Sequence, residues 1–247
     1  MSASLASTAT HSGGKAVVVL QSNYIPWKGY FDLIHDADLF VFYDDVQFTK
    51  NDWRNRNRIK TASGSKWLTI PVGTGTDRQV CEVEMADPRW QSSHWDSLRQ
   101  AYGKQPFFKH YRPFFEGVYL GQRWHSLSDL NQTLIKRIAT ELLGITTRFE
   151  DSRAYAAQGA KLDRLLHLLS LTGAQRYITG PAARDYIDAA RFVEHGIELT
   201  WKDYSGYPVY EQAHPPFEHG VSILDLLFSV GPDAPRYIWG WREGGSS

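Results

Sequence analysis

The sequence predicts a doubly wound α/β fold, with a mostly parallel sheet and helices on both faces. Residues 16–21 (AVVVLQ) form a β-branched apolar run without polar alternation, which is typical of a buried central strand. Residues 39–43 (LFVFY) form a second such run, and the apolar spacing of residues 29–35 predicts a short helix between them. A strand, a helix and a strand in such close succession indicate a compact parallel unit.

The alternation of predicted strands and helices continues along the chain. Further strands are predicted over residues 53–60, 66–72, 176–179 and 197–201. Further helices are predicted over residues 92–103, 113–119, 126–143, 161–171, 189–195 and 222–228. Because no internal repeat or linker interrupts this pattern, we expect one α/β domain over residues 16–242. A disordered leader (residues 1–15) is expected before it and a frayed tail (residues 243–247) after it.

The composition excludes several classes of protein. The chain has 27 basic and 27 acidic residues, so no global field attracts nucleic acid or an anionic membrane. The single cysteine, Cys81, rules out an internal disulfide framework and a thiolate-rich zinc site, and we expect it to be a buried structural thiol. No apolar run approaches the roughly 20 residues of a membrane helix. We therefore expect a cytoplasmic protein without nucleic-acid or membrane partners.

Polar and aromatic residues follow the first two strands where each strand ends. The first strand is followed by Gln21, Asn23, Tyr24, Trp27 and Tyr30. The second strand is followed by Asp44, Asp45 and Gln47. In open α/β sheets ligands bind at the carboxyl ends of the strands, and aromatic side chains beside polar groups make amphipathic ligand walls. We therefore expect a substrate site here.

Asp44 and Asp45 are candidate catalytic residues. Adjacent residues on a strand point to opposite faces, so at most one of them is expected to face a substrate. A carboxylate at that place could take a proton from an amine or pair with an ammonium group. The alternative is structural: one aspartate caps a helix and the other pairs with Arg54 or Arg56.

Residues 53–58 (WRNRNR) form a dense cluster of guanidinium and amide groups. Alternation along a strand would place Trp53, Asn55 and Asn57 on one face and Arg54, Arg56 and Arg58 on the other. Such a cluster suits bidentate recognition of phosphate or carboxylate. With zero net charge, a nucleotide-linked sugar or a pantetheine-type carrier fits it better than nucleic acid. A salt-bridged surface hairpin is the structural alternative.

Other catalytic motifs are absent. The nine histidines show no His-Glu-x-x-His spacing, so neither a metal nor another cofactor is expected. His214, in a proline-rich segment, is the best candidate base, although it fits an ordinary surface histidine as well. The chain has no Gly-x-Ser-x-Gly elbow, no phosphate loop and no Gly-x-Gly-x-x-Gly after the first strand, which disfavours serine-nucleophile, P-loop and dinucleotide chemistry.

The segments LQSNYIPWKGYFDLI and DLFVFYDDVQFTKNDWRNRNRI closely resemble the opening of the WbqC-like protein family. A looser resemblance continues through YITGPAARDYI, GIELTWKDYSGYPVYEQ and FEHGVSILDLLFSVGP, over residues 17–232. Members occur in gene clusters for O-antigens and for amino-sugar or peptide-like natural products, and several are assigned as transferases. The resemblance implies a biosynthetic enzyme whose site includes Gln21, Tyr24, Trp27, Tyr30, Asp44, Asp45, Gln47, Trp53, Asn55, Arg56 and Asn57.

A weaker similarity concerns the loop after the first strand. The layout of YIPWKGY is similar to the His-x-Gly-His loop of nucleotidylyltransferases, with both histidines missing. It implies a nucleotidylyltransferase-like Rossmannoid sheet without adenylation chemistry.

These observations and the resemblance together predict a transferase that forms an amide. An acyl or aminoacyl group would move from a carrier thioester, held on an acyl or peptidyl carrier protein or on coenzyme A, to the amine of an amino-sugar or amino-acid-like acceptor. Asp44 or Asp45 would handle the amine proton, Arg54 and Arg56 would grip an anionic group, and the side-chain amides next to them would stabilise the oxyanion. The alternatives are a non-catalytic binding or scaffold protein and a nucleotidyl- or glycosyltransferase.

Overall fold

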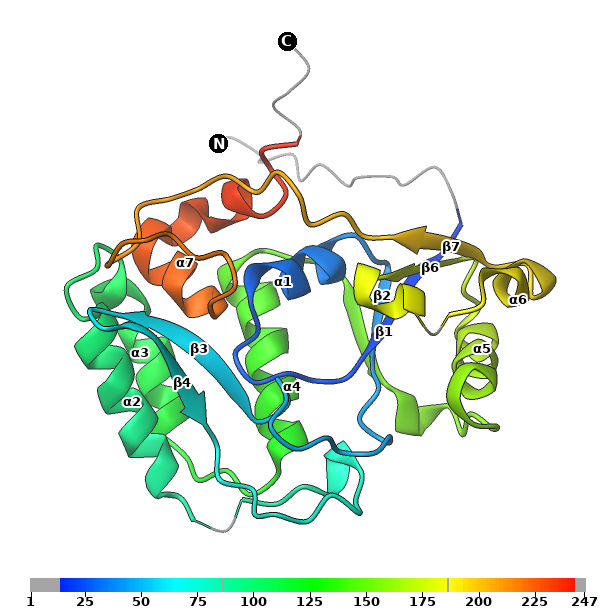
Figure 1. Cartoon of the computed structure of the whole chain (residues 1–247), viewed down its shortest axis with the longest axis horizontal. Coiled ribbons are helices and arrows are strands. Elements are labelled where there is room, and N and C mark those ends of the chain that lie inside the picture. Colours follow the sequence, from blue (N-terminus) through cyan, green and yellow to red (C-terminus); the bar gives the residue numbers. More distant parts are fainter. Residues whose placement is uncertain (1–13, 86, 186, 243–247) are drawn as a thin grey trace, which may run out of the picture.

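The structure, a computed structural model, describes residues 14–85, 87–185 and 187–242 (Figure 1). Its main sheet has five strands in the order β5-β2-β1-β6-β7, and every neighbouring pair is parallel. The strands are β1 (Ala16–Leu20), β2 (Leu39–Phe42), β5 (Arg148–Asp151), β6 (Arg176–Thr179) and β7 (Glu198–Trp201). The predicted doubly wound, mostly parallel sheet is confirmed.

The strand order fixes where a ligand is expected to bind. The chain begins in the middle of the sheet with β1, moves outward through β2 and β5, and returns to the other side of β1 with β6. This is the 3-2-1-4-5 order of a Rossmann fold, whose ligands bind where the order reverses, at the carboxyl ends of the strands. In this chain the reversal lies between β1 and β6.

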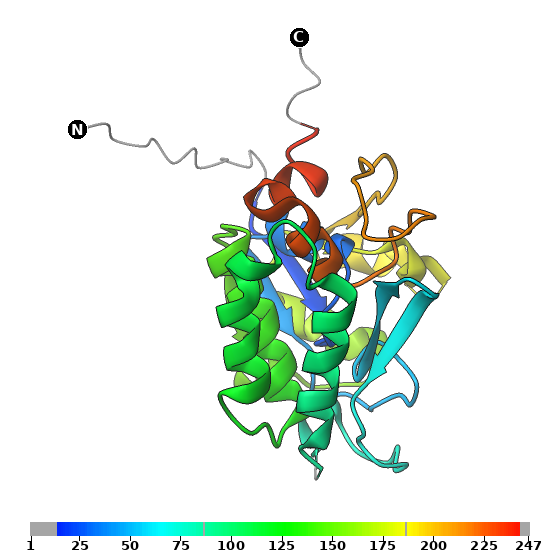
Figure 2. The ribbon, with the colours of Figure 1, turned by 90° about the vertical axis from the view of Figure 1, so that its left-hand side faces the viewer.

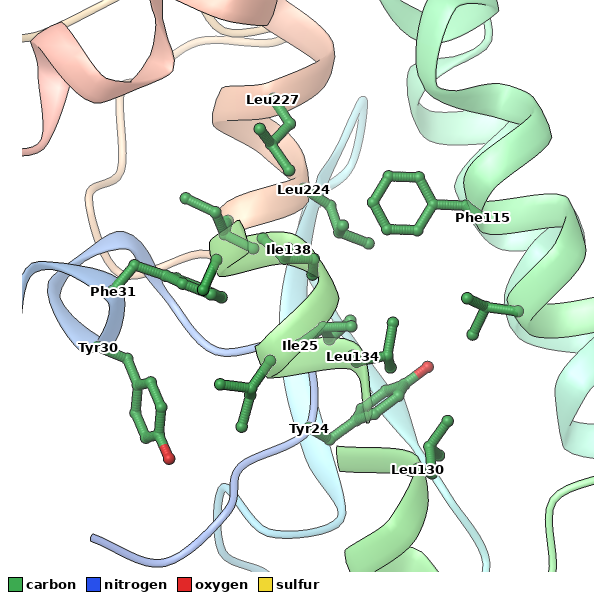
Figure 3. Close-up of a cluster of buried hydrophobic side chains, with 14 of the residues drawn as sticks. Tyr24, Ile25, Tyr30, Phe31, Phe115, Leu130, Leu134, Ile138, Leu224 and Leu227 are labelled. Atoms are coloured by element: carbon green, nitrogen blue, oxygen red, sulfur yellow. The ribbon is translucent and has the colours of Figure 1, made fainter. Parts of the chain in front are cut away.

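Each face of the sheet has its own hydrophobic core, because side chains alternate along a strand. Val18, Phe40 and Phe42 belong to one core, which also contains residues of the helices within 28–35, 89–137 and 223–230. Val17 and Val41 belong to the other core, with residues of the helices within 161–194. Figure 3 shows part of the first core, where side chains such as Phe31, Leu134 and Leu224 from three different helices converge.

The helices lie close to their predicted positions. They are α1 (Lys28–His35), α2 (Arg89–Tyr102), α3 (Phe108–Leu120), α4 (Leu127–Arg137), α5 (Lys161–Thr172), α6 (Ala189–Glu194) and α7 (Ile223–Val230). Short 3-10 or π turns are η1 (Val80–Glu82), η2 (Ile138–Leu142), η3 (Ser152–Ala154), η4 (Pro181–Asp185) and η5 (Gly231–Tyr237). Figure 2 shows α2 and α3 side by side, and Trp95 of α2 stacks between Phe108 and Tyr119 of α3. No helix in the described ranges is both long and apolar enough to span a bilayer.

Two of the predicted strands form a separate antiparallel hairpin. They are β3 (Arg56–Thr61) and β4 (Gly64–Thr69), which pair only with each other among the described residues. The hairpin is tied to the start of α7, since the amide of Ser222 donates to the carbonyl of Arg58 over 2.8 Å, and to the loop after β1 through the Asn57 side chain. Figure 1 shows this hairpin beside α2, away from the main sheet.

An ion network ties the last described residues to α1. The buried Asp32 carboxylate accepts hydrogen bonds from Tyr207 (2.5 Å) and Arg242 (2.9 Å), and Lys202 lies 2.8 Å from it. The predicted leader and tail fall outside the described residues, except for Gly14 and Lys15. The Lys15 ammonium group donates to the carbonyl of Thr172 over 2.6 Å.

Candidate functional site

A cavity of about 260 Å³ lies where the loop after β1, the start of the hairpin and the residues before α7 meet. Its walls are Asn23, Pro26, Trp27, Trp53, Asn57, Arg58 and Gly220. We call it the loop–hairpin cavity. Asn23, Trp27, Trp53 and Asn57 were predicted as site residues, and Arg58 belongs to the predicted arginine cluster. The structure thus brings part of the predicted stretch together at the carboxyl end of the central strand β1.

The loop that forms one wall has a strained backbone. Ile25 has φ 36°, a left-handed conformation that a β-branched residue rarely adopts. The Asn57 amide holds it there, because its Nδ2 group donates to the carbonyls of Tyr24 and Ile25 over 3.0 Å each. The amide of Ile223 donates to the Pro26 carbonyl over 2.9 Å. Strain that the surrounding structure maintains is found preferentially at functional sites.

The two asparagines of the hairpin have structural contacts. Both Nδ2 hydrogens of Asn57 are used by the carbonyls of the strained loop. The Nδ2 group of Asn55 donates to the Ile70 carbonyl over 2.9 Å. The geometry therefore does not support the predicted role of these amides as oxyanion donors.

The outward face of the hairpin carries Trp67 and two arginines, and Trp53 lies beside it. The alternation predicted for Trp53 is wrong, because β3 begins only at Arg56 and Trp53 lies in the turn before it. The Arg56 guanidinium lies 4.3 Å and the Arg58 guanidinium 5.8 Å from the centre of the Trp67 ring. The Trp53 and Trp67 rings lie 5.3 Å apart, and these side chains are 40% and 41% exposed. We call Trp53, Arg56, Arg58 and Trp67 the Trp–Arg face.

The guanidinium groups of the predicted cluster differ in their partners. Arg54 lies 2.6 Å from the Asp52 carboxylate. Arg56 and Arg58 have no carboxylate within ion-pair distance in the described part of the chain. The structural alternative of a salt-bridged hairpin therefore accounts for Arg54 alone.

Asp44 lies on the α4 side of the sheet and is fully buried. Its carboxylate accepts hydrogen bonds from the Ser22 amide (2.8 Å), the Ser128 hydroxyl (2.5 Å) and the Gln132 amide (3.1 Å). These donors neutralise the cost of burying the charge. Asp44 does not line the loop–hairpin cavity.

Asp45 lies on the opposite side of the sheet, toward α5, as alternation predicted. It accepts a 2.5 Å hydrogen bond from the Ser152 hydroxyl and forms an ion pair with Arg164. The predicted alternative, in which one aspartate pairs with Arg54 or Arg56, is wrong, because Asp45 pairs with Arg164 of α5. Together with Gln47, Asp45 lines a separate surface depression near residues 77–82.

Tyr24 and Tyr30 lie in the first core rather than in the cavity (Figure 3). The Tyr24 hydroxyl lies 2.9 Å from Nδ1 of His94 and 2.6 Å from the Tyr119 hydroxyl. The Tyr30 hydroxyl donates to the Gln21 carbonyl over 2.9 Å. Burial raises the pKa of both tyrosines, and the Tyr24 pKa rises further because of Tyr119. Both hydroxyls are therefore protonated structural donors.

His214 lies in a different cavity, of about 470 Å³. The walls of that cavity come from the turn of the hairpin, the second half of α2 and the segment around His214 itself, and they include Lys66 and Lys104. The structure does not bring His214 together with Asp44, Asp45 or the loop–hairpin cavity.

His219 is a candidate base that sequence reasoning missed. It directly precedes Gly220 in the cavity wall, and its ring lies 6.3 Å from the Tyr207 ring. Partial desolvation and then the charge of Lys28 lower the pKa of the exposed His219 below its usual value, which favours the neutral imidazole. No local motif around His219 marks it, because Lys28 is distant in the sequence.

Lys28 was also missed. Its side chain is buried, with the ammonium nitrogen 3.4 Å from the Pro208 carbonyl oxygen and 4.7 Å from the centre of the Tyr207 ring. Burial lowers the Lys28 pKa to about 8, although Asp32 and Asp225 oppose this shift. Lys28 therefore places a positive charge close enough to His219 to act on its pKa.

One group of possible metal ligands occurs among the described residues. Asp32, His35 and Asp36 have ligand atoms within 4.8 Å of one another. Lys202 lies 2.8 Å from Asp32 and 2.5 Å from Asp36, and Arg242 also binds Asp32. These cations already satisfy the carboxylates, so the group fits a structural ion network better than a metal centre.

Comparisons with known proteins place the chain in a family. The model of the WbqC-like protein family matches residues 21–237, a range that includes every residue lining the loop–hairpin cavity. A protein of Mycobacterium tuberculosis, named uncharacterized protein Rv1507c, is 44% identical over 226 residues, covering 91% of this chain and 97% of the relative. No solved structure matches the chain. The chain belongs to the WbqC-like protein family.

Proposed function

We propose that the protein is a biosynthetic transferase that forms an amide. It would move an acyl or aminoacyl group from a carrier thioester to the amine of an amino-sugar or amino-acid-like acceptor. The observation that supports this proposal most is a small cavity lined by two tryptophans and Arg58, and neither Arg58 nor the nearby Arg56 has a carboxylate partner among the described residues. Such arginines suit the phosphate that pantetheine-type and nucleotide-linked donors carry.

The size of the cavity fits the reacting ends of two substrates. Its volume of about 260 Å³ lies below the roughly 300–1,000 Å³ of sites that enclose a whole drug-sized ligand. In the proposed reaction the amine nitrogen attacks the thioester carbonyl, a C–N bond forms, the C–S bond breaks, and the sulfur leaves as a thiol. Holding the two groups in contact supplies much of the acceleration, because a thioester is already activated.

The acceptor must lose a proton before or during the attack. We propose His219 as the proton acceptor, since its lowered pKa favours the neutral imidazole and the residue directly precedes Gly220 in the cavity wall. The thiolate that leaves then receives a proton, so protons balance over the reaction. In this proposal Asp44 and Asp45 maintain the scaffold and do not handle the amine proton.

The reaction is tested by measuring free thiol and amide together. Acyl and aminoacyl thioesters of coenzyme A and of pantetheine are incubated with amino sugars and amino acids. The expected result is amine-dependent thiol release with an amide of matching mass. Thiol release that does not depend on the amine, or no amide from any pair at saturating protein, would reject amide formation.

A non-catalytic binding protein is the second candidate. The specific observation that favours it is that the cavity walls contain no carboxylate, and that both candidate aspartates are already hydrogen-bonded elsewhere. For this candidate, carrier thioesters would raise the melting temperature without any turnover.

A further inference from the structure

The exposed tryptophans are unusual for this chain. Among the described residues the exposed large apolar side chains are Trp53, Trp67, Leu120, Leu171, Val193 and Val209. The aliphatic ones come from separate elements or loops, whereas the two tryptophan rings lie 5.3 Å apart at a 40° angle. An adjacent pair of exposed aromatic rings is more typical of a binding surface than of scattered surface residues.

Core packing does not account for these two rings. Trp67 lies opposite Arg58 in the hairpin register, and it is on the outward face. Ile59 and Leu68 supply the inward contacts of the same two strands and are buried. A polar residue at position 67 would therefore leave the core of the hairpin intact.

The Trp–Arg face is continuous with the loop–hairpin cavity. Trp53 and Arg58 line the cavity and also belong to the face. A ligand that is too large for the cavity would therefore extend over Trp67 and Arg56.

The arginines of the face retain hydrogen-bonding capacity. Arg58 donates through Nη2 to the Gly220 carbonyl over 2.9 Å, and the Arg56 guanidinium donates no hydrogen bond within the described part of the chain. The nearby carboxylate of Asp52 already pairs with Arg54, so it is not a partner of Arg56 or Arg58. The face thus carries two local positive charges on a chain whose net charge is zero.

We propose that the Trp–Arg face binds a nucleoside phosphate group, with the base stacked on the tryptophans and the phosphates on Arg56 and Arg58. Stacking on an aromatic face suits any nucleobase, and guanidinium groups recognise phosphate. This inference rests on the proposed function for one point: the nucleoside phosphate is the handle of the donor, and the rest of the donor reaches into the cavity. The same handle occurs in coenzyme A thioesters and in nucleotide-linked sugars.

Calorimetric titration of the full chain tests the inference. The probes are coenzyme A, 3′,5′-ADP, UDP, 4′-phosphopantetheine and inorganic diphosphate. We expect the nucleotide probes to bind at least about ten-fold more tightly than the two probes without a base. Tighter binding of coenzyme A and 3′,5′-ADP identifies a coenzyme A donor, and tighter binding of UDP identifies a nucleotide-sugar donor. Equal affinity of 4′-phosphopantetheine and coenzyme A would overturn the inference.

Matched variants locate the contact. Trp67→Ala should abolish the advantage of the nucleotide probes, and Trp67→Phe should restore most of it. Arg56→Gln should weaken every phosphate probe about ten-fold. Arg54→Gln is the control, since Arg54 already pairs with Asp52, and it should change no affinity. Unchanged nucleotide affinity in folded Trp67→Ala would overturn the inference.

The inference and the proposed function fail in different ways. Amide formation from pantetheine thioesters without any nucleotide binding would overturn the nucleoside site and leave the transferase proposal standing. Nucleotide binding that depends on Trp67, without amide formation from any donor, would support the site and reject the reaction.

Discussion

The carboxyl end of β2 and the outward face of the hairpin both carry clustered charged residues, but these residues differ in whether other side chains pair with them. Asp44 and Asp45 follow an apolar strand, as polar residues follow β1, yet each carboxylate is held by donors from other helices or turns. Arg56 and Arg58 have no carboxylate partner among the described residues, and the tryptophans beside them are exposed. Polar groups whose hydrogen bonds are satisfied maintain a scaffold, whereas unmatched ones remain available to a ligand.

The largest effect is expected at Asp44. Asp44→Ala leaves the Ser22 amide, the Ser128 hydroxyl and the Gln132 amide without their acceptor. We expect the free energy of unfolding to fall by about 3 kcal/mol or more. Urea denaturation measures it. A variant with unchanged stability that has lost turnover would reverse the comparison, because Asp44 would then be a catalytic residue.

The second effect distinguishes His219 from His214. His219→Gln removes the proposed proton acceptor and should lower kcat about 100-fold, equivalent to roughly 2.7 kcal/mol in the activation free energy. His214→Gln is the matched control and should keep full turnover, because His214 lies in another cavity. If His214→Gln lost turnover instead, the original prediction from sequence would be the correct one.

Asp45→Asn is expected to have a moderate effect on stability. The Asp45 and Arg164 side chains are 13% and 18% exposed, so their pair is stronger than a surface ion pair but less costly to break than a fully buried one. We expect the free energy of unfolding to fall by about 1–2 kcal/mol. Lost turnover at unchanged stability would show that the carboxylate acts on a substrate.

A small effect on stability is expected at Arg56. Arg56→Gln removes a cation–π contact with Trp67 and no ion pair to any described residue, so we expect a loss of less than about 1 kcal/mol. The same denaturation experiment measures it. A loss as large as that of Asp44→Ala would mean that the Trp–Arg face is part of the scaffold, against the comparison.

The smallest effect concerns pH. A neutral imidazole is needed to accept the proton, and the His219 pKa is lowered, so kcat/KM should fall only as the pH drops below about 6.5. Lys28→Met removes the neighbouring charge and should raise the His219 pKa, which moves the acid limb of the profile to higher pH. If the acid limb of the kcat/KM profile did not move in Lys28→Met, a group other than His219 would control it.

Much of the fold could be predicted because the central strands are buried on both faces and therefore appear as continuous apolar runs. β5 was missed because it lies at the edge of the sheet and carries the polar residues Arg148 and Glu150 within its four residues. The two strands of the hairpin were found, but a period-two pattern does not say which sheet a strand joins.

The site was predicted only in part, because some of its residues meet only through tertiary contacts. Asn23 and Trp27 follow β1 directly, so the rule about strand ends finds them. Gly220 reaches the same cavity through tertiary contacts such as the hydrogen bond from Ser222 to Arg58, and no local pattern reveals these contacts or the place of His219 before Gly220. The helix residues that bind Asp44 are likewise distant in the sequence.

The separation of the hairpin from the main sheet has an evolutionary consequence. The proposed recognition groups Arg56 and Arg58 of β3 and Trp67 of β4 point outward, while Asn57 and Ile59 of β3 point inward and fasten the hairpin to the rest of the chain. Because alternate positions are independent, mutations could change one set without disturbing the other. Members of the family could therefore diverge in the ligands they accept while the five-stranded sheet and its two cores stay the same.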